Sequence, residues 1–178
     1  GQASRNLHTW ARRHWLFDSS IVCPTLLNNW EGTYFDFNEE SLKEIIDNVA
    51  SMGLEMFVLD DGWFGNRDDD FSSLGDWFLH KDKFPNGLDK VIDICHKNDM
   101  DFGIWFEPEM ISPDSDIYRA HPDWCLHTEG RDKSIARTQY VIDYSRKEVR
   151  DYIYARMYDI LSNNNIDYVK WDFNRNLT

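Results

Sequence analysis

One stretch points to the architecture of this chain: Glu55-Met56-Phe57-Val58-Leu59-Asp60-Asp61-Gly62. Its first part is a short, mostly apolar run, and the run stops at two carboxylates and a glycine. Further runs at residues 21–27, 102–106 and 167–171 also stop at polar residues, and residues 140–143 form one more short extended run. Short apolar runs with such boundaries are typical of buried strands. We therefore predict about four main strands.

Amphipathic helices separate these strands. Apolar residues recur at helical spacing between residues 42 and 49, after Asn38 as the predicted N-cap and before Gly53 as the predicted stop. Residues 88–95 and 149–160 carry similar stripes, and Ser145 with Glu148 forms a predicted capping box. Strands that alternate with helices predict βαβ units and a parallel sheet. We predict an α/β fold with about four parallel strands and three long helices, in residues 21–178, after a connecting segment of residues 1–20.

The size of the chain bears on this fold. The chain has 178 residues, whereas a complete (β/α)8 barrel typically has about 250. The length therefore fits a partial barrel better than a complete one.

Composition excludes several classes of function. The net charge of −13 disfavours a nucleic-acid partner. The apolar runs are far shorter than the roughly 20 residues that a membrane helix needs, and no signal peptide opens the chain. Cys23, Cys95 and Cys125 have no C-x-x-C spacing, which disfavours a disulfide framework or a zinc site. We expect idle thiols, a cytoplasmic location, no membrane contact and no cofactor.

Carboxylates follow three of the predicted strands: Asp60 and Asp61, then Glu107 and Glu109, then Asp172. The carboxyl ends of parallel strands meet at one edge, so these side chains should share one mouth. Such a cluster suits glycoside hydrolysis, binding of Mg²⁺ or Ca²⁺, or hydrogen bonds to sugar hydroxyls. Tryptophans near the strand ends favour a carbohydrate site. These are Trp30, Trp63, Trp77, Trp105 and Trp171.

Simpler interpretations of the same residues stay open. Asp60-Asp61-Gly62 is also a common polar turn, and Glu107 and Glu109 are also suited to pair with a buried arginine. Trp105 fits the core as well as a ligand platform. We interpret residues 68–70, three consecutive aspartates, as a solvated acidic loop.

Lys170 and Asp172 lie two residues apart on one predicted strand, so their side chains share a face and Trp171 points the other way. A surface salt bridge explains this spacing. A functional pair at the mouth of the sheet also explains it, because desolvating two charges is costly outside a site.

Seven segments carry a resemblance to a known family: residues 30–37, 59–65, 74–77, 83–88, 105–110, 118–124 and 167–175. In this order and spacing they resemble the first half of the catalytic barrel of glycoside hydrolase family 36, the bacterial and fungal α-galactosidases or melibiases. The resemblance extends over about residues 22–178. It implies retaining hydrolysis of terminal α-linked galactose in oligosaccharides of the raffinose or melibiose type.

The resemblance also implies roles for individual residues. Asp172 would be the nucleophile, and a neighbouring cation would favour its ionised form. The implied galactose-binding residues are Trp30, Asp60, Asp61, Trp105, Arg137, Lys170 and Asn174. No metal or cofactor is implied.

In this family the general acid/base is an Asp on a later strand, which we expect to lie beyond residue 178. We therefore expect the 178-residue chain by itself to be almost inactive, as a fragment of an α-galactosidase. The alternatives are a non-catalytic galactose-binding half-barrel and a metal-dependent hydrolase that uses Asp60, Asp61, Glu107 and Asp172. Because a half-barrel leaves two sheet edges open, we also expect a homo-oligomer or a longer polypeptide.

Overall fold

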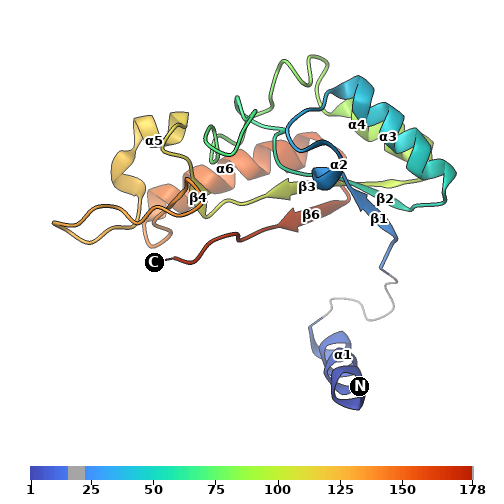
Figure 1. Cartoon of the computed structure of the whole chain (residues 1–178), viewed down its shortest axis with the longest axis horizontal. Coiled ribbons are helices and arrows are strands. Elements are labelled where there is room, and N and C mark those ends of the chain that lie inside the picture. The colour runs from blue at the N-terminus through green and yellow to red at the C-terminus, as the bar shows by residue number, and fades with distance from the viewer. Residues whose placement is uncertain (16–22, 178) are drawn as a thin grey trace.

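The computed structural model describes residues 1–15 and 23–177. A four-stranded parallel sheet lies at its centre, in the order β1-β2-β3-β6 (Figure 1). Its strands are β1 (Leu26–Asn28), β2 (Met56–Leu59), β3 (Asp101–Phe106) and β6 (Tyr168–Trp171). The predicted α/β class and the partial-barrel architecture are confirmed.

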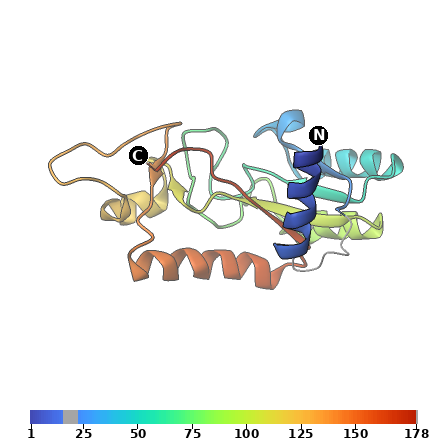
Figure 2. The same cartoon turned by 90° about the horizontal axis from the view of Figure 1, so that it is seen from below.

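Three long helices connect these strands: α3 (Glu39–Ser51), α4 (Asp89–Lys97) and α6 (Lys147–Asn163). Figure 2 shows α6 running along one side of the sheet, as expected of a crossover helix between parallel strands. The shorter elements are α2 (Trp30–Thr33), α5 (Asp116–Ala120), the 3-10 helix η1 (Pro122–Trp124), β4 (Met110–Ile111) and β5 (Tyr140–Val141). β4 and β5 pair antiparallel in a separate sheet.

The signals at the ends of α3 act as predicted. The Asn38 side chain accepts hydrogen bonds from the backbone N–H groups of Glu40 and Ser41, and the Ser41 hydroxyl accepts one from the N–H of Asn38. Gly53 follows the helix with φ +83°, a conformation that glycine adopts without strain. The sequence therefore determines both ends of this helix locally.

One prediction is wrong, one falls partly outside the described residues, and the predicted connecting segment contains a helix. Helix α1 (Gln2–His14) occupies most of the predicted connecting segment; none of its residues is buried, and it stands apart from the sheet in Figure 1. The predicted strand at 21–27 begins outside the described residues, and the structure places β1 at Leu26–Asn28. The predicted capping box at α6 is wrong, because Arg146 is the N-cap and no side chain caps the helix.

The two faces of the sheet have different neighbours. Phe57, Phe102 and Ile104 belong to the main apolar core, together with the buried stripes of the long helices. On the opposite face a Cβ atom at Gly103 would lie 2.8 Å from Cδ1 of Tyr168. This close approach requires glycine at position 103 and allows β6 to pair tightly with β3. The predicted site residues lie at the carboxyl ends of the strands, on the side of this second face.

Candidate active site

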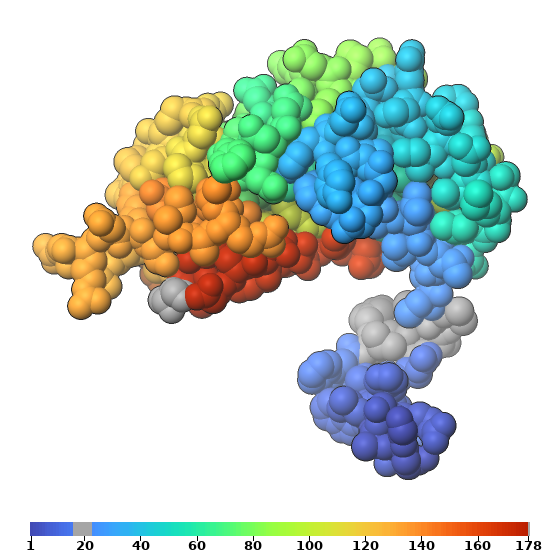
Figure 3. Space-filling view, in the orientation of Figure 1, coloured from blue at the N-terminus to red at the C-terminus, as the bar shows by residue number. Residues whose placement is uncertain are grey.

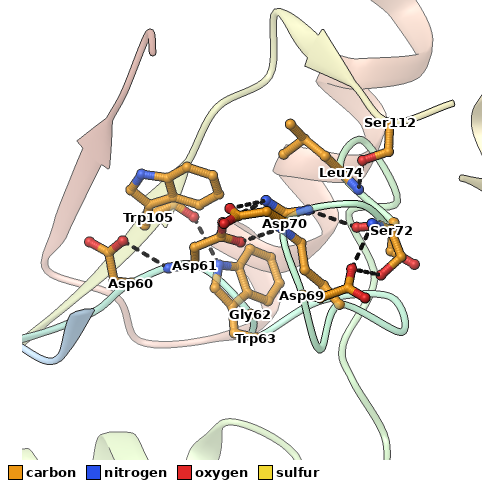
Figure 4. Close-up of polar contacts among 12 residues, drawn as sticks. Asp60, Asp61, Gly62, Trp63, Asp69, Asp70, Ser72, Leu74, Trp105 and Ser112 are labelled. Atoms are coloured by element: carbon orange, nitrogen blue, oxygen red, sulfur yellow. Dashed lines mark hydrogen bonds and ion pairs between the residues drawn. The ribbon is translucent and has the colours of Figure 1, made fainter. Parts of the chain in front are cut away.

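The carboxyl ends of β2, β3 and β6 open into one pocket of about 240 Å³. Figure 4 shows Asp60, Asp61 and Trp105 close together where β2 and β3 end. All eight residues predicted from the sequence line this pocket: Trp30, Asp60, Asp61, Trp105, Arg137, Lys170, Asp172 and Asn174. The structure thus brings the predicted set together, and the roles of its members remain predictions.

Asp172 follows β6 and is held by donors from two strands. Its Oδ2 atom accepts a hydrogen bond of 3.0 Å from Nε1 of Trp105, and its Oδ1 atom accepts one of 3.0 Å from the N–H of Phe173. Partial burial raises the pKa of Asp172, but the hydrogen bonds from Trp105, Asn174 and Phe173 and the charge of Lys170 together lower it below its ordinary value. Asp172 is therefore ionised at neutral pH, as a carboxylate nucleophile must be.

Lys170 lies between two carboxylates. Its Nζ atom is 2.7 Å from Oδ2 of Asp60 and 3.9 Å from Oδ2 of Asp172. Asn28 also donates to Oδ2 of Asp60, and the Asn29 side chain accepts from the Asp60 N–H at 2.8 Å. Lys170 and Asp172 therefore share a face, as predicted, and the pair belongs to the pocket instead of forming an isolated surface salt bridge.

Asp61 has a partner that the sequence analysis missed. Arg67 is only 1% exposed and contacts both oxygens of Asp61, from Nε at 2.6 Å and from Nη2 at 2.8 Å. Burial raises the pKa of the Asp61 carboxyl, and the charge and hydrogen bonds of Arg67 oppose this rise. Because Asp61 and Arg67 are both buried, the segment Asp60-Asp61-Gly62 is not an ordinary solvated turn. A lone arginine before three aspartates was the only sequence signal for this pair.

The acidic loop 68–70 is only partly solvated. Asp68 is exposed and contacts Nζ of the buried Lys83 at 2.9 Å. Asp69 accepts hydrogen bonds from the N–H groups of Phe71 and Ser72, and Figure 4 shows Asp69 beside Ser72. Asp70 lines the pocket. The interpretation as a solvated loop therefore missed one pocket residue.

Glu107 is almost completely buried beside Asp172. Its Oε1 atom accepts a hydrogen bond from the N–H of Asn174. Burial raises the pKa of Glu107, the hydrogen bonds from Asn174 oppose this rise, and the charge of Asp172 adds to it. Glu107 thereby holds the backbone that follows the candidate nucleophile.

The sequence also allowed Glu107 and Glu109 to be partners of a buried arginine. For the buried Arg175 this interpretation is wrong. That side chain donates instead to backbone carbonyls, including those of Ser134 at 3.1 Å and Gln139. Figure 3 shows the resulting contact, where the end of the chain (red) lies against the segment before β5 (orange). Glu109 accepts hydrogen bonds from Nε1 of Trp171 at 3.0 and 3.2 Å.

A tight turn carries Arg137 into the pocket. Arg137 and Thr138 both have positive φ, 51° and 61°, and the backbone groups of Ala136 and Gln139 bond to each other across the turn. Two consecutive left-handed residues that are not glycine are uncommon. Gln139, which the sequence analysis also missed, lines the same pocket.

The five tryptophans that the sequence analysis singled out divide into three groups. Trp30 and Trp105 line the pocket. Trp63 and Trp77 are fully buried in the core, and Nε1 of Trp63 donates to the Trp105 carbonyl at 2.8 Å (Figure 4). Trp171 points away from the pocket, as predicted, and is exposed. The aromatic signal thus identified two pocket walls and two core residues.

The metal-dependent alternative lacks a suitable geometry. Within residues 1–15 and 23–177, no group of three or more His, Cys, Asp or Glu side chains is arranged to hold a metal ion. Asp60, Asp61 and Asp172 instead contact Lys170, Arg67 and Trp105. The three cysteines are free, and burial raises the pKa of Cys95 to about 12. In the same described residues, no helix has the length and apolarity to cross a membrane.

Comparisons with known proteins agree with this geometry. The family model described as Melibiase matches residues 1–178. Alpha-galactosidase Mel36A of Lactobacillus acidophilus is 58% identical over 157 residues, which are 88% of this chain and 21% of the relative. The chain thus spans about a fifth of the length of such curated relatives.

Two solved structures show the same relation. GH36 alpha-galactosidase AgaB from Geobacillus stearothermophilus superposes with a TM-score of 0.87 at 54% identity, covering 90% of this chain and 22% of that one. A variant of alpha-galactosidase AgaA from the same organism, in complex with raffinose, gives a TM-score of 0.84 at 53% identity, covering 88% and 22%.

Proposed function

Because the chain belongs to the melibiase family, we propose that it is the part of an α-galactosidase that holds the nucleophile and much of the galactose pocket. The observation that carries this proposal is the environment of Asp172. Its carboxylate is ionised, lies in a pocket with Lys170 and Asp60, and is oriented by Nε1 of Trp105. The preferred substrates would be oligosaccharides with terminal α-linked galactose, since variants of one relative, alpha-galactosidase AgaA, are seen in complex with raffinose and with stachyose.

The proposed chemistry is retaining glycoside hydrolysis. An Asp172 oxygen attacks the anomeric carbon, a carboxylate–sugar bond forms, and the glycosidic bond breaks with its electrons going to the leaving oxygen. That oxygen must then gain a proton. Water finally cleaves the galactosyl ester and releases galactose.

Residues 1–178 supply only part of this reaction. The family resemblance places the acid/base Asp on a strand that follows the nucleophile strand, and β6 is the last strand in the described residues. General acid catalysis typically contributes about 10²–10⁴-fold. We therefore propose that the isolated chain turns over ordinary galactosides very slowly.

A leaving group that needs no protonation separates the nucleophile's role from that of the missing acid. We expect α-galactosyl fluoride to label the chain with one galactosyl group on the peptide that contains Asp172, since no base then activates water. Mass spectrometry of the digested chain measures the label. Asp172→Asn should remove it, whereas Asp159→Asn, a change at an exposed position on α6, should keep it.

Two outcomes would count against this proposal. Labelling that persists in Asp172→Asn would assign the nucleophile elsewhere. Galactose binding by calorimetry without labelling would favour the non-catalytic galactose-binding module.

A further inference from the structure

Gln139 carries an unused hydrogen-bonding group at the pocket. Its side chain is 3% exposed and lines the pocket beside Arg137. Its Oε1 atom is buried and has no hydrogen-bond partner within the described part of the chain. Buried amide oxygens are rarely left unpaired in native proteins, because they lose their hydrogen bonds to water. This atom therefore calls for a partner that the described residues do not supply.

The backbone of Gln139 is fixed on both sides. Its N–H donates to the Ala136 carbonyl at 3.0 Å, and its own carbonyl accepts from the Ala136 N–H at 3.3 Å and from the buried Arg175. These bonds fix the position of the Gln139 backbone beside the pocket. The backbone is thus held in place, and the side-chain acceptor is unsatisfied within the described residues.

The residues before Gln139 are held in an unfavourable conformation. Arg137 and Thr138 both have positive φ, and the Thr138 hydroxyl donates to the Asp70 carbonyl at 2.7 Å. Such backbone conformations persist only where the surroundings enforce them, and they cluster at ligand clamps. Here the strained turn presents two side chains, Arg137 and Gln139, to one pocket.

We propose that Gln139 is a substrate-contacting residue whose amide oxygen accepts a hydrogen bond from a hydroxyl group of galactose. This inference rests on the proposed function. The pocket carboxylates Asp60, Asp61 and Asp172 already contact groups of the protein. Gln139 supplies a neutral acceptor that has no such partner among residues 1–15 and 23–177, and sugar hydroxyls are suitable donors.

Gln139→Met tests the role of the amide, because methionine has a similar volume and no amide group. Calorimetry on the full 178-residue chain gives the Kd for galactose and for its 2-, 3-, 4- and 6-deoxy analogues. We expect Gln139→Met to raise the Kd for galactose about three- to tenfold, the size of one neutral hydrogen bond. One deoxy analogue lacks the contacted hydroxyl. For that analogue, the variant and the unmodified chain should have the same Kd.

A stability measurement and a control complete the experiment. The urea midpoint of Gln139→Met should equal or exceed that of the unmodified chain, because the variant buries no unpaired amide. Gln2→Met, at an exposed position in α1, should change neither quantity.

Each outcome has a distinct meaning. Equal galactose affinity in Gln139→Met and the unmodified chain overturns the inference and leaves the proposed function standing. A Kd that rises equally for galactose and all four analogues overturns it as well, because it shows an effect of shape. If the unmodified chain binds no galactose, both the proposed function and this inference fail.

Discussion

Replacing Arg67 by methionine would test how the buried ion pair holds Asp61. Arg67 contacts both oxygens of Asp61, at 2.6 and 2.8 Å, and this two-point geometry is that of a guanidinium and an ionised carboxylate. Arg67→Met keeps much of the apolar stem but removes the charge. Asp61 would then be a buried carboxylate with the charge of Asp60 nearby and no compensating cation.

The expected loss of stability follows from two limits. Removing one partner of a buried ion pair typically costs about 3–5 kcal/mol. Protonation of Asp61 would remove its buried charge and so limit this cost. For a carboxyl of pKa about 3.9, the free energy of protonation is roughly 4 kcal/mol at pH 7 but only about 1.5 kcal/mol at pH 5. We therefore expect a loss of about 3–4 kcal/mol at pH 7 that shrinks to about 1.5 kcal/mol at pH 5.

Burial raises the pKa of Asp61 in the unmodified chain too, but there Arg67 opposes the rise, so the pH dependence should be larger in the variant. In Arg67→Met burial raises the pKa of Asp61 above its unfolded value, so the folded state binds the extra proton and the stability of the variant falls as pH rises. Urea unfolding at pH 5 and pH 7 measures both free energies. The double variant with Asp61→Asn should lose the pH dependence.

A matched control separates burial from charge. Arg119 also contacts two carboxylates, Asp114 and Asp116, but its side chain is 55% exposed. Arg119→Met should cost less than about 1 kcal/mol. If Arg67→Met costs no more than Arg119→Met at pH 7, or if its loss does not shrink at pH 5, the reasoning is refuted.

Three further predictions concern the sheet and its surface. Trp105→Phe removes a donor to Asp172 and should raise the pKa of Asp172. A carboxyl whose pKa is lowered by folding stabilises the folded state at neutral pH, and this stabilisation is lost as the pH falls. The variant should therefore lose less stability than the unmodified chain between pH 6 and pH 2 in urea titrations. An equal loss would contradict this. Gly103→Ala should cost about 1–3 kcal/mol in urea unfolding, since its Cβ would meet the Tyr168 ring, and a neutral effect would count against the close packing. The chain should self-associate, as measured by light scattering, and Tyr154→Lys, a change in the apolar groove beside α6, should reduce this self-association. A monomer of the unmodified chain in dilute solution would contradict the prediction.

The strand ends and their acids could be predicted from the sequence because they depend on local patterns. Asp60 and Asp172 follow apolar runs directly, and a parallel sheet brings such positions to one edge whatever path the loops take. Asp60, Trp105, Lys170 and Asp172 come together for this reason, whereas Arg137 reaches the pocket through the turn before β5.

Other features depend on contacts that no local pattern reports. Arg67 lies in the long loop after β2, and the path of that loop is fixed by contacts such as those of Lys83 Nζ with the Gly62 and Arg67 carbonyls, both at 3.1 Å. The unpaired oxygen of Gln139 becomes visible only when all its neighbours are placed. Helix α1 buries no residue, so it left no core-facing apolar stripe to detect.

The order of the strands has a consequence for synthesis on the ribosome. Each strand of the sheet pairs with the one made before it, β2 with β1, β3 with β2 and β6 with β3. A nascent chain can therefore extend the sheet from its N-terminal edge as residues emerge. The donor Trp105 and the acids at positions 60 and 61 are translated several seconds before Asp172, at about 5–20 residues per second. Strand β6 is thus made after the three strands that precede it in the sheet, and it brings Lys170 and Asp172 to the pocket.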